Sequence, residues 1–286
     1  MNSPRDLRRR IRSISGTAQI TKAMQMVAAS KMRKAQQAAL EARAFARLLY
    51  RMQRSAIAHA PGFTHALLEK RPVRARAVIL VAADKGLCGA LNTNVFRVAS
   101  QYDPASTIFI TAGRRAAQFV SRTRRQLAAE FAYGDAPTFP EARAIASFAR
   151  QLFMTGQVDQ VHIVSTRFVN TLTQTPVALD LLPIGVITAE QIPGVDTGDV
   201  DDTSEAVFEP DSETVLGYLL ERYINIFVYF LLLNAKASEQ SARMVSMKNA
   251  TDSAEALIKD LTLAYNKLRQ GNITKELLEI AGGQAE

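Results

Sequence analysis

The fold is decided by residues 5–57, which read RDLRRRIRSISGTAQITKAMQMVAASKMRKAQQAALEARAFARLLYRMQRSAI. This stretch has no proline and a single glycine, and its abundant alanine, glutamine, lysine, arginine, methionine and leucine favour helix. Apart from polar Thr21 and Gln25, small and apolar residues recur at alternating spacings of four and three, the period of a coiled coil. Because this seam is mostly alanine, we expect a partner helix to approach it closely. The seam consists of Leu7, Ile11, Ile14, Ala18, Ala28, Met32, Ala35, Ala39, Ala42, Ala46 and Leu49.

The C-terminal part of the chain has the same character. Residues 211–280 contain no proline and only two glycines, Gly217 and Gly271, and they predict a second helix. At about 70 residues such a helix is roughly 100 Å long. Its apolar stripe would be exposed on a lone helix, so we expect the two terminal helices to pack on each other, antiparallel. The stripe comprises Ala254, Leu257, Leu261, Ala264 and Leu268.

Between these helices, short runs rich in β-branched residues alternate with helical stretches. This βαβ succession predicts a small, mainly parallel sheet covered by helices. The expected strands are 77–83, 107–111 and 161–166, followed by an extended segment over 172–182. The expected helices are 92–101, 114–122 and 141–155.

The predicted fold class is therefore α/β, with a small Rossmann-like domain beside a long antiparallel coiled coil formed by the N- and C-terminal helices. A segment rich in glycine, proline and aspartate separates the sheet from the second helix. The predicted domains are a coiled-coil helix over 1–58, an α/β domain over 74–184, a linker and foot loop over 185–210, and a second coiled-coil helix over 211–286.

Charge is concentrated at the front of the chain. The 286 residues carry a net charge of +8, and residues 1–55 hold thirteen arginines and lysines against only Asp6 and Glu41. A basic stripe of this kind indicates an anionic partner: nucleic acid, lipid headgroups or an acidic protein surface. Only Phe45 and Tyr50 supply aromatic rings within it, which argues against base stacking and so against nucleic acid.

The residues indicate no catalytic or metal site. The turn Asp84–Asn92 lies between a strand and a helix, but its Gly86 and Gly89 match neither common phosphate-binding glycine pattern, so we interpret it as a tight turn. Cys88 is the only cysteine, and the three histidines lack the paired spacing of zinc ligands. The longest apolar run, 223–233, is too short to cross a bilayer. We predict no catalytic residue, cofactor or metal.

Several segments together resemble the γ subunits of F-type ATP synthases. The resemblance spans the chain, and its most specific motifs lie at the two ends. It rests on Ile11–Ile14, Ile20–Arg33, Asp84–Asn92, Ala237–Asp252 and Leu261–Ile280. It implies a subunit that is not an enzyme by itself, a central rotor whose coiled coil turns inside a hexamer of α and β subunits while ATP is made or hydrolysed on β.

The resemblance also implies site residues and partners. It implies a contact between the basic helix and an acidic loop of β through Lys22, Met24, Arg33 and Arg243. It implies a turn beneath β, made by Asp84, Lys85, Gly86, Cys88 and Gly89. It implies a foot on the membrane-embedded c-ring, made by Phe208, Glu209, Pro210 and Asp211. The small ε subunit is a further implied partner, and the expected location is the cytoplasmic side of a bacterial inner membrane, reached only through the complex.

The chain departs from the family pattern at several positions. Lys85 replaces the usual arginine and Ala90 a frequent glycine, while Asn234 and Lys236 stand where an acidic and an apolar residue are common. Two other functions stay open at this point: a nucleotide-dependent α/β enzyme and a nucleic-acid adaptor that uses the basic helix. Whether protons or sodium ions are moved is not specified by this sequence, because the ion site of the family lies on other subunits.

Overall fold

The computed structural model describes residues 3–58, 63–184 and 211–282, without the side chains of 42–58 and of a few positions in the last helix. The described chain forms two compact units. The helical unit comprises 1–29 and 243–286, and the sheet unit comprises 30–242. The predicted domain boundaries stay a prediction, because these units divide the long helices instead of separating them from the sheet.

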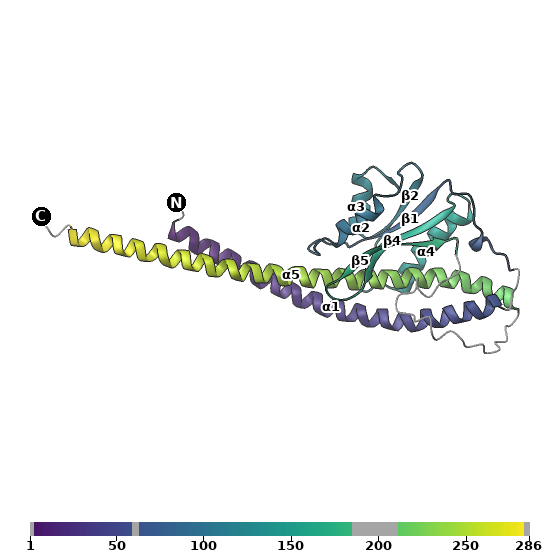
Figure 1. The fold of residues 1–286 in the computed structure, drawn as a ribbon, viewed down its shortest axis with the longest axis horizontal. Coiled ribbons are helices and arrows are strands. Elements are labelled where there is room, and N and C mark those ends of the chain that lie inside the picture. Colours follow the sequence, from purple (N-terminus) through teal and green to yellow (C-terminus); the bar gives the residue numbers. More distant parts are fainter. Residues whose placement is uncertain (1–2, 59–62, 185–210, 283–286) are drawn as a thin grey trace. The chain divides into compact units, whose positions relative to one another are not determined.

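Two long helices contribute to both units (Figure 1): α1 (Pro4–Ala58) and α5 (Ser212–Gly282). Each begins at a side-chain cap. The Ser3 hydroxyl accepts a hydrogen bond from the Asp6 backbone N–H at 3.2 Å, and the Asp211 carboxylate accepts one from the Thr214 N–H at 2.7 Å. Such caps satisfy N–H groups that have no partner within the helix.

In the helical unit the two helices pair antiparallel (Figure 1), as predicted. Their seam contains a hydrogen bond between two buried threonines, with the Thr21 and Thr251 Oγ1 atoms 2.7 Å apart. The burial expected for Leu257 and Ala264 is wrong, because both side chains are exposed. One partner helix covers only a narrow stripe of α5, so apolar side chains outside that stripe stay on the surface. The buried seam residues are Leu7, Ala18, Thr21, Ala28, Met247, Thr251 and Ala254.

The sheet unit contains one five-stranded sheet in the order β3-β2-β1-β4-β5. All neighbouring strands are parallel except β4 and β5, which form an antiparallel hairpin. The predicted fold class, a mainly parallel α/β sheet with a long helix pair, is thereby confirmed. The strands are β1 (Arg76–Val81), β2 (Thr107–Ala112), β3 (Gln126–Phe131), β4 (Gln160–Phe168) and β5 (Gln174–Leu182).

The edge strand β3 is not predicted by the sequence. Its residues, QLAAEF, include no β-branched side chain, and all six are partly or fully exposed. It forms because β2 offers a free edge with which its backbone pairs in parallel. A short 3₁₀ helix, η1 (Ala66–Leu68), also escapes prediction.

Helices cover both faces of this sheet (Figure 1). Alternate residues of β1 point to opposite faces, so Val78 and Leu80 join one core and Ile79 and Val81 the other. The first core contains α2 (Leu91–Ala99) and α3 (Arg114–Arg122). The second contains α4 (Phe139–Met154) and part of α5.

The apolar run in α5 is part of this second core. By length and composition alone α5 could cross a membrane, with a mean hydropathy of 1.5 in its most apolar window. More than half of that window is buried inside the protein, and Phe227, Val228, Leu231 and Leu232 pack in the core with α4 and the sheet. The run is therefore part of a core helix, as predicted from the sequence.

Tight packing around the alanines of α1 gives a stability prediction. Ala35 and Ala39 are both buried. Replacing either with leucine should lower the free energy of unfolding by about 1–3 kcal/mol, because the added atoms have no room. Urea unfolding of the full chain would measure this, with exposed Gln37→Leu as the control. Equal stability of Ala39→Leu and the control would contradict the close packing.

Candidate functional site

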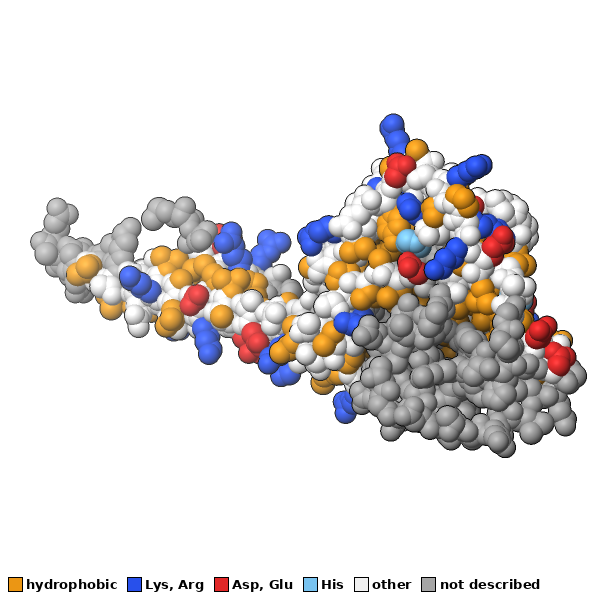
Figure 2. Space-filling model, turned by 45° about the vertical axis from the view of Figure 1, so that its right-hand side comes forward, with side chains coloured by type: hydrophobic (Ala, Val, Ile, Leu, Met, Phe, Trp, Pro, Cys, Tyr) orange, Lys and Arg blue, Asp and Glu red, His pale blue; other side chains and the backbone are white. Residues whose placement is uncertain are grey.

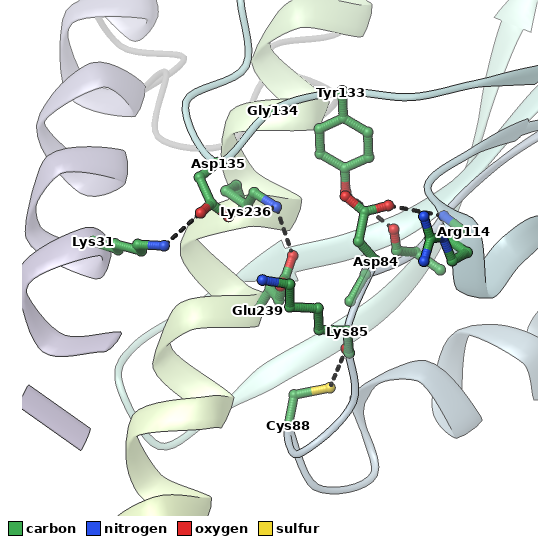
Figure 3. Close-up of polar contacts among 12 residues, drawn as sticks. Lys31, Asp84, Lys85, Cys88, Arg114, Tyr133, Gly134, Asp135, Lys236 and Glu239 are labelled. Carbon is green, nitrogen blue, oxygen red and sulfur yellow. Dashed lines mark hydrogen bonds and ion pairs between the residues drawn. The ribbon is translucent and has the colours of Figure 1, made fainter. Parts of the chain in front are cut away.

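The turn that follows β1 is held by its own polar groups (Figure 3). The Asp84 carboxylate accepts a hydrogen bond from the Arg114 backbone N–H at 2.9 Å, at the start of α3. A carboxylate is stabilised there by the positive end of the helix dipole. The Asn92 side chain accepts a hydrogen bond from the Ala83 N–H at 3.1 Å, which ties the other end of the turn to α2.

The predicted turn residues occupy this one loop. Leu87 and Gly89 have positive φ angles of 62° and 60°, which reverse the chain sharply. Leu87 is 62% exposed, whereas Cys88 is 2% exposed and packs with Ala83, Leu91 and Ala242 of α5. The turn thus presents a leucine to the outside and keeps its thiol inside.

Beside the turn lies a partly buried polar cluster that the sequence reasoning did not assemble (Figure 3). The Lys236 ammonium lies 3.0 Å from a Glu239 oxygen, 3.5 Å from an Asp135 oxygen and 4.9 Å from the centre of the Tyr133 ring. Asp135 also pairs with Lys31 of α1. Only one signal in the sequence pointed here, a lysine just after an apolar run with a glutamate three residues later.

Burial and charge shift two pKa values in this cluster. The hydrogen bond from Lys31, with the nearby Lys236 charge, lowers the pKa of Asp135 below its usual value. Complete burial, followed by the charges of Glu239, Asp84 and Asp135, raises the pKa of the Tyr133 hydroxyl well above its usual value. At neutral pH Asp135 is therefore an anion and Tyr133 a neutral hydrogen-bond donor.

The residues expected to contact β are distributed over both units. Lys22, Met24 and Arg243 belong to the helical unit and Arg33 to the sheet unit. Lys22 and Arg33 are exposed, Met24 is half-buried and Arg243 is buried. Their common site remains a prediction, with Lys22 and Arg33 the most accessible members.

Most of the expected foot lies outside the described residues, namely Phe208, Glu209 and Pro210. Asp211 is described, and its carboxylate caps α5 through the backbone N–H and hydroxyl of Thr214. Hydrogen bonds from Thr214 lower the pKa of Asp211, so it is ionised at neutral pH. This capping bond is a structural role that the sequence reasoning did not assign.

A second polar group lies where β4 begins and β5 ends. The His162 Nδ1 atom is 2.9 Å from the Tyr102 hydroxyl, and its Nε2 atom is 3.5 Å from an Asp180 oxygen. His162 and Asp180 border a cavity of about 340 Å³ that Lys70 and Arg71 also line. Within residues 3–58, 63–184 and 211–282, no cluster of three or more metal-ligating side chains is found.

His162 gives a pH prediction. Burial lowers its pKa below the ordinary 6.5, against the opposing effect of Asp180. The unfolded chain therefore binds more protons here than the folded chain, so His162 should cost stability as the pH falls below about 6.5. Urea unfolding between pH 7.5 and 5.5 should show less loss for His162→Gln than for the unchanged chain. A parallel loss in both would contradict this assignment.

Comparison with known proteins addresses the whole chain. The family model described as ATP synthase matches residues 3–285. A protein of Opitutus terrae named ATP synthase gamma chain is 46% identical over 290 residues, covering 99% of this chain and 98% of that relative. The chain belongs to the ATP synthase gamma chain family. Another member, from Methylacidiphilum infernorum, is 41% identical over 289 residues, with 99% of each chain covered. The family resemblance predicted from the terminal motifs is confirmed.

Solved structures of similar fold come from mitochondrial ATP synthases. A chain in the central stalk and c-ring structure from Tetrahymena thermophila has a TM-score of 0.61 and 26% identity, covering 81% of this chain and 99% of that one. A chain in a Euglena gracilis ATP synthase structure has a TM-score of 0.67, with 98% of this chain and 93% of that chain covered. At 18% identity, this second likeness concerns the fold alone.

Proposed function

We propose that this chain is the central rotor shaft of an F-type ATP synthase. The coiled coil turns inside a hexamer of α and β subunits and couples ion flow through the c-ring to ATP synthesis or hydrolysis on β. The chain is a non-catalytic subunit of that complex. An asymmetric shaft drives such a cycle if it makes different contacts with each conformation of a catalytic site, because only differential contacts shift populations.

The observation that carries this proposal is the unpartnered apolar surface of the helical unit. Figure 2 shows hydrophobic side chains along the visible surface of the paired helices. Two helices cannot bury all of this surface between them, and an apolar surface of this extent marks an interaction site. A surrounding ring of subunits would cover it. The exposed residues are Ile20, Met26, Val27, Leu257, Leu263, Ile273, Leu277 and Leu278.

The remaining contacts are proposed by family position. Exposed Lys22 and Arg33, with Met24 and Arg243, would face an acidic loop of β, which gives the basic helix its anionic partner. The turn around Leu87 would pass beneath β. The foot at 208–211 would meet the c-ring, with ε beside it. The complex would lie at the cytoplasmic side of a bacterial inner membrane.

The two other functions have less support. A nucleotide-dependent enzyme would need phosphate contacts in the turn, but Gly86 and Gly89 match neither common phosphate-binding glycine pattern. A nucleic-acid adaptor would use the basic helix, which is poor in aromatic side chains. Calorimetry with ATP and Mg²⁺, and salt-dependent binding of DNA, would detect either one.

Neutralising Lys22 should affect coupling more than catalysis. In purified complex within vesicles, Lys22→Gln should retain most ATP hydrolysis and lower the number of ions pumped per ATP, since the residue lies outside the nucleotide sites. Exposed Lys259→Gln, in the same helical unit, is the matched control. Loss of hydrolysis and pumping in a fixed ratio would contradict a coupling role. Failure of the chain to assemble with α and β subunits would reject the shaft function itself.

A further inference from the structure

Lys236 is the most unusual charged residue in the sheet unit, because its side chain is 1% exposed. Lysine is almost never fully buried without a partner, since removing an ammonium group from water is costly. It lies directly after an apolar run whose other members pack in the core. A leucine or methionine would fill the same space, so the charge itself needs an explanation.

The cluster around Lys236 pairs opposite charges (Figure 3). Lys31 and Lys236 both pair with Asp135, and Lys236 also pairs with Glu239. Glu239 is also buried, with 4% of its side chain exposed, so its pair with Lys236 is shielded from solvent. Buried pairs of this kind contribute little net stability but fix geometry, because breaking them leaves an uncompensated charge.

Tyr133 connects this cluster to the turn. The ammonium lies over its ring at 4.9 Å from the centre, a cation–π contact that holds the ring in place. At the far end of the ring, the hydroxyl donates a hydrogen bond of 3.1 Å to the Ala82 carbonyl. Ala82 lies two residues before Asp84, where the turn begins. The contacts therefore run without interruption from α5 to the base of the turn.

The loop that carries Tyr133 is itself restrained. The Glu141 carboxylate accepts hydrogen bonds from the Gly134 N–H at 3.0 Å and from the Thr138 N–H at 2.6 Å. These bonds tie both ends of the segment to α4. Asp135, between them, faces Lys31 and Lys236. A displacement of Lys236 is therefore transmitted to Tyr133 instead of being absorbed by a loose loop.

We propose that Lys236 is a positioning residue that acts through Tyr133 to hold the turn Asp84–Gly89 against α5. This inference rests on the proposed function, in which that turn meets the catalytic subunits as the shaft rotates. The Lys236 ammonium holds the Tyr133 ring in place, and the Tyr133 hydroxyl holds the Ala82 carbonyl. The loop Asp84–Gly89 therefore keeps one position relative to α5 while the shaft rotates.

Cys88 is a built-in reporter for this position. It is the only cysteine, it lies in the turn, and it is buried against Ala242. A thiol reagent such as Ellman's reagent reaches it only when the turn opens, so its labelling rate in the isolated full chain measures local opening. Lys236→Met keeps the length of the side chain and removes its charge. Tyr133→Phe keeps the ring and removes the bond to Ala82.

Tyr133→Phe should raise the labelling rate about tenfold, the change in opening equilibrium expected from losing one hydrogen bond. Lys236→Met should raise it at least as much, because it also leaves the buried Glu239 charge without this partner. If the two residues act along one route, the double variant should label about as fast as the faster single variant. Independent effects would multiply and would refute the route through Tyr133. Exposed Lys34→Met is the matched control and should leave the rate unchanged.

The denaturant dependence of labelling separates positioning from a merely structural role. A local opening of the turn exposes little surface, so its rate should depend weakly on urea. If labelling in the variants follows global unfolding, with the same steep urea dependence, Lys236 only stabilises the fold and the inference is wrong. An unchanged rate in Tyr133→Phe would also overturn it. Because this measurement needs no other subunit, failure of the shaft function would appear separately, as failure to assemble.

Discussion

Multi-site ATP hydrolysis by the assembled complex will stop when residue 87 is joined to a β subunit by a disulfide, and reductant will restore it. A shaft that must pass three β subunits in turn cannot rotate when fixed to one of them. We expect essentially complete loss of turnover in the oxidised complex. This result rests on the proposed function and tests motion in addition to assembly.

The structure decides where this bond should be made. Cys88 is buried, whereas the neighbouring Leu87 projects into solvent from the same turn. The suitable chain therefore carries Leu87→Cys together with Cys88→Ser, which leaves one cysteine, and that one accessible. Its partner cysteine belongs on the facing surface of β, where the two Cα atoms can approach within about 7 Å.

Two controls make the result decisive. Cys88→Ser alone should show normal turnover with or without oxidant, since its thiol has no chemical role in the proposed mechanism. The paired cysteines under reducing conditions should also show normal turnover. Full hydrolysis with the disulfide quantitatively formed would show that the chain does not turn relative to β, and the shaft function would be wrong.

The largest effect on stability is expected at Gly113, which caps the start of α3. Its φ angle is +97°, and a Cβ added there would lie 2.1 Å from the Ala82 carbonyl oxygen. That oxygen already accepts the Tyr133 hydrogen bond, and Ala82 lies in a core strand region that cannot easily move. Gly113→Ala should lower the free energy of unfolding by at least about 3 kcal/mol, combining backbone strain with a steric clash.

Gly156 provides the matched control. It also has a positive φ, +71°, but no atom lies within 4 Å of an added Cβ. Gly156→Ala should therefore cost only the backbone term, about 1 kcal/mol. Urea unfolding of both variants gives the comparison. If both substitutions lowered the free energy of unfolding equally, the backbone near Ala82 would have moved to remove the clash. The turn region would then be less rigid than its packing indicates.

Local properties of the sequence determined the two long helices, the mainly parallel sheet and the family. Helix composition and a spacing of three and four are visible within a few turns of chain, so α1 and the antiparallel pairing could be predicted without coordinates. The terminal motifs identified the family for the same reason, as their residues are contiguous. The segment 84–92 also forms the tight turn that the sequence predicted.

Tertiary structure alone decided the features that depend on contacts between distant residues. Strand β3 forms because its backbone pairs with the free edge of β2. The residues of β3 do not by themselves predict a strand. Asp135 pairs with both Lys31 and Lys236. Each of these two lysines lies more than a hundred residues from Asp135 in the sequence. No local sequence pattern predicts this cluster, because burial and charge pairing depend on which distant residues the fold brings into contact.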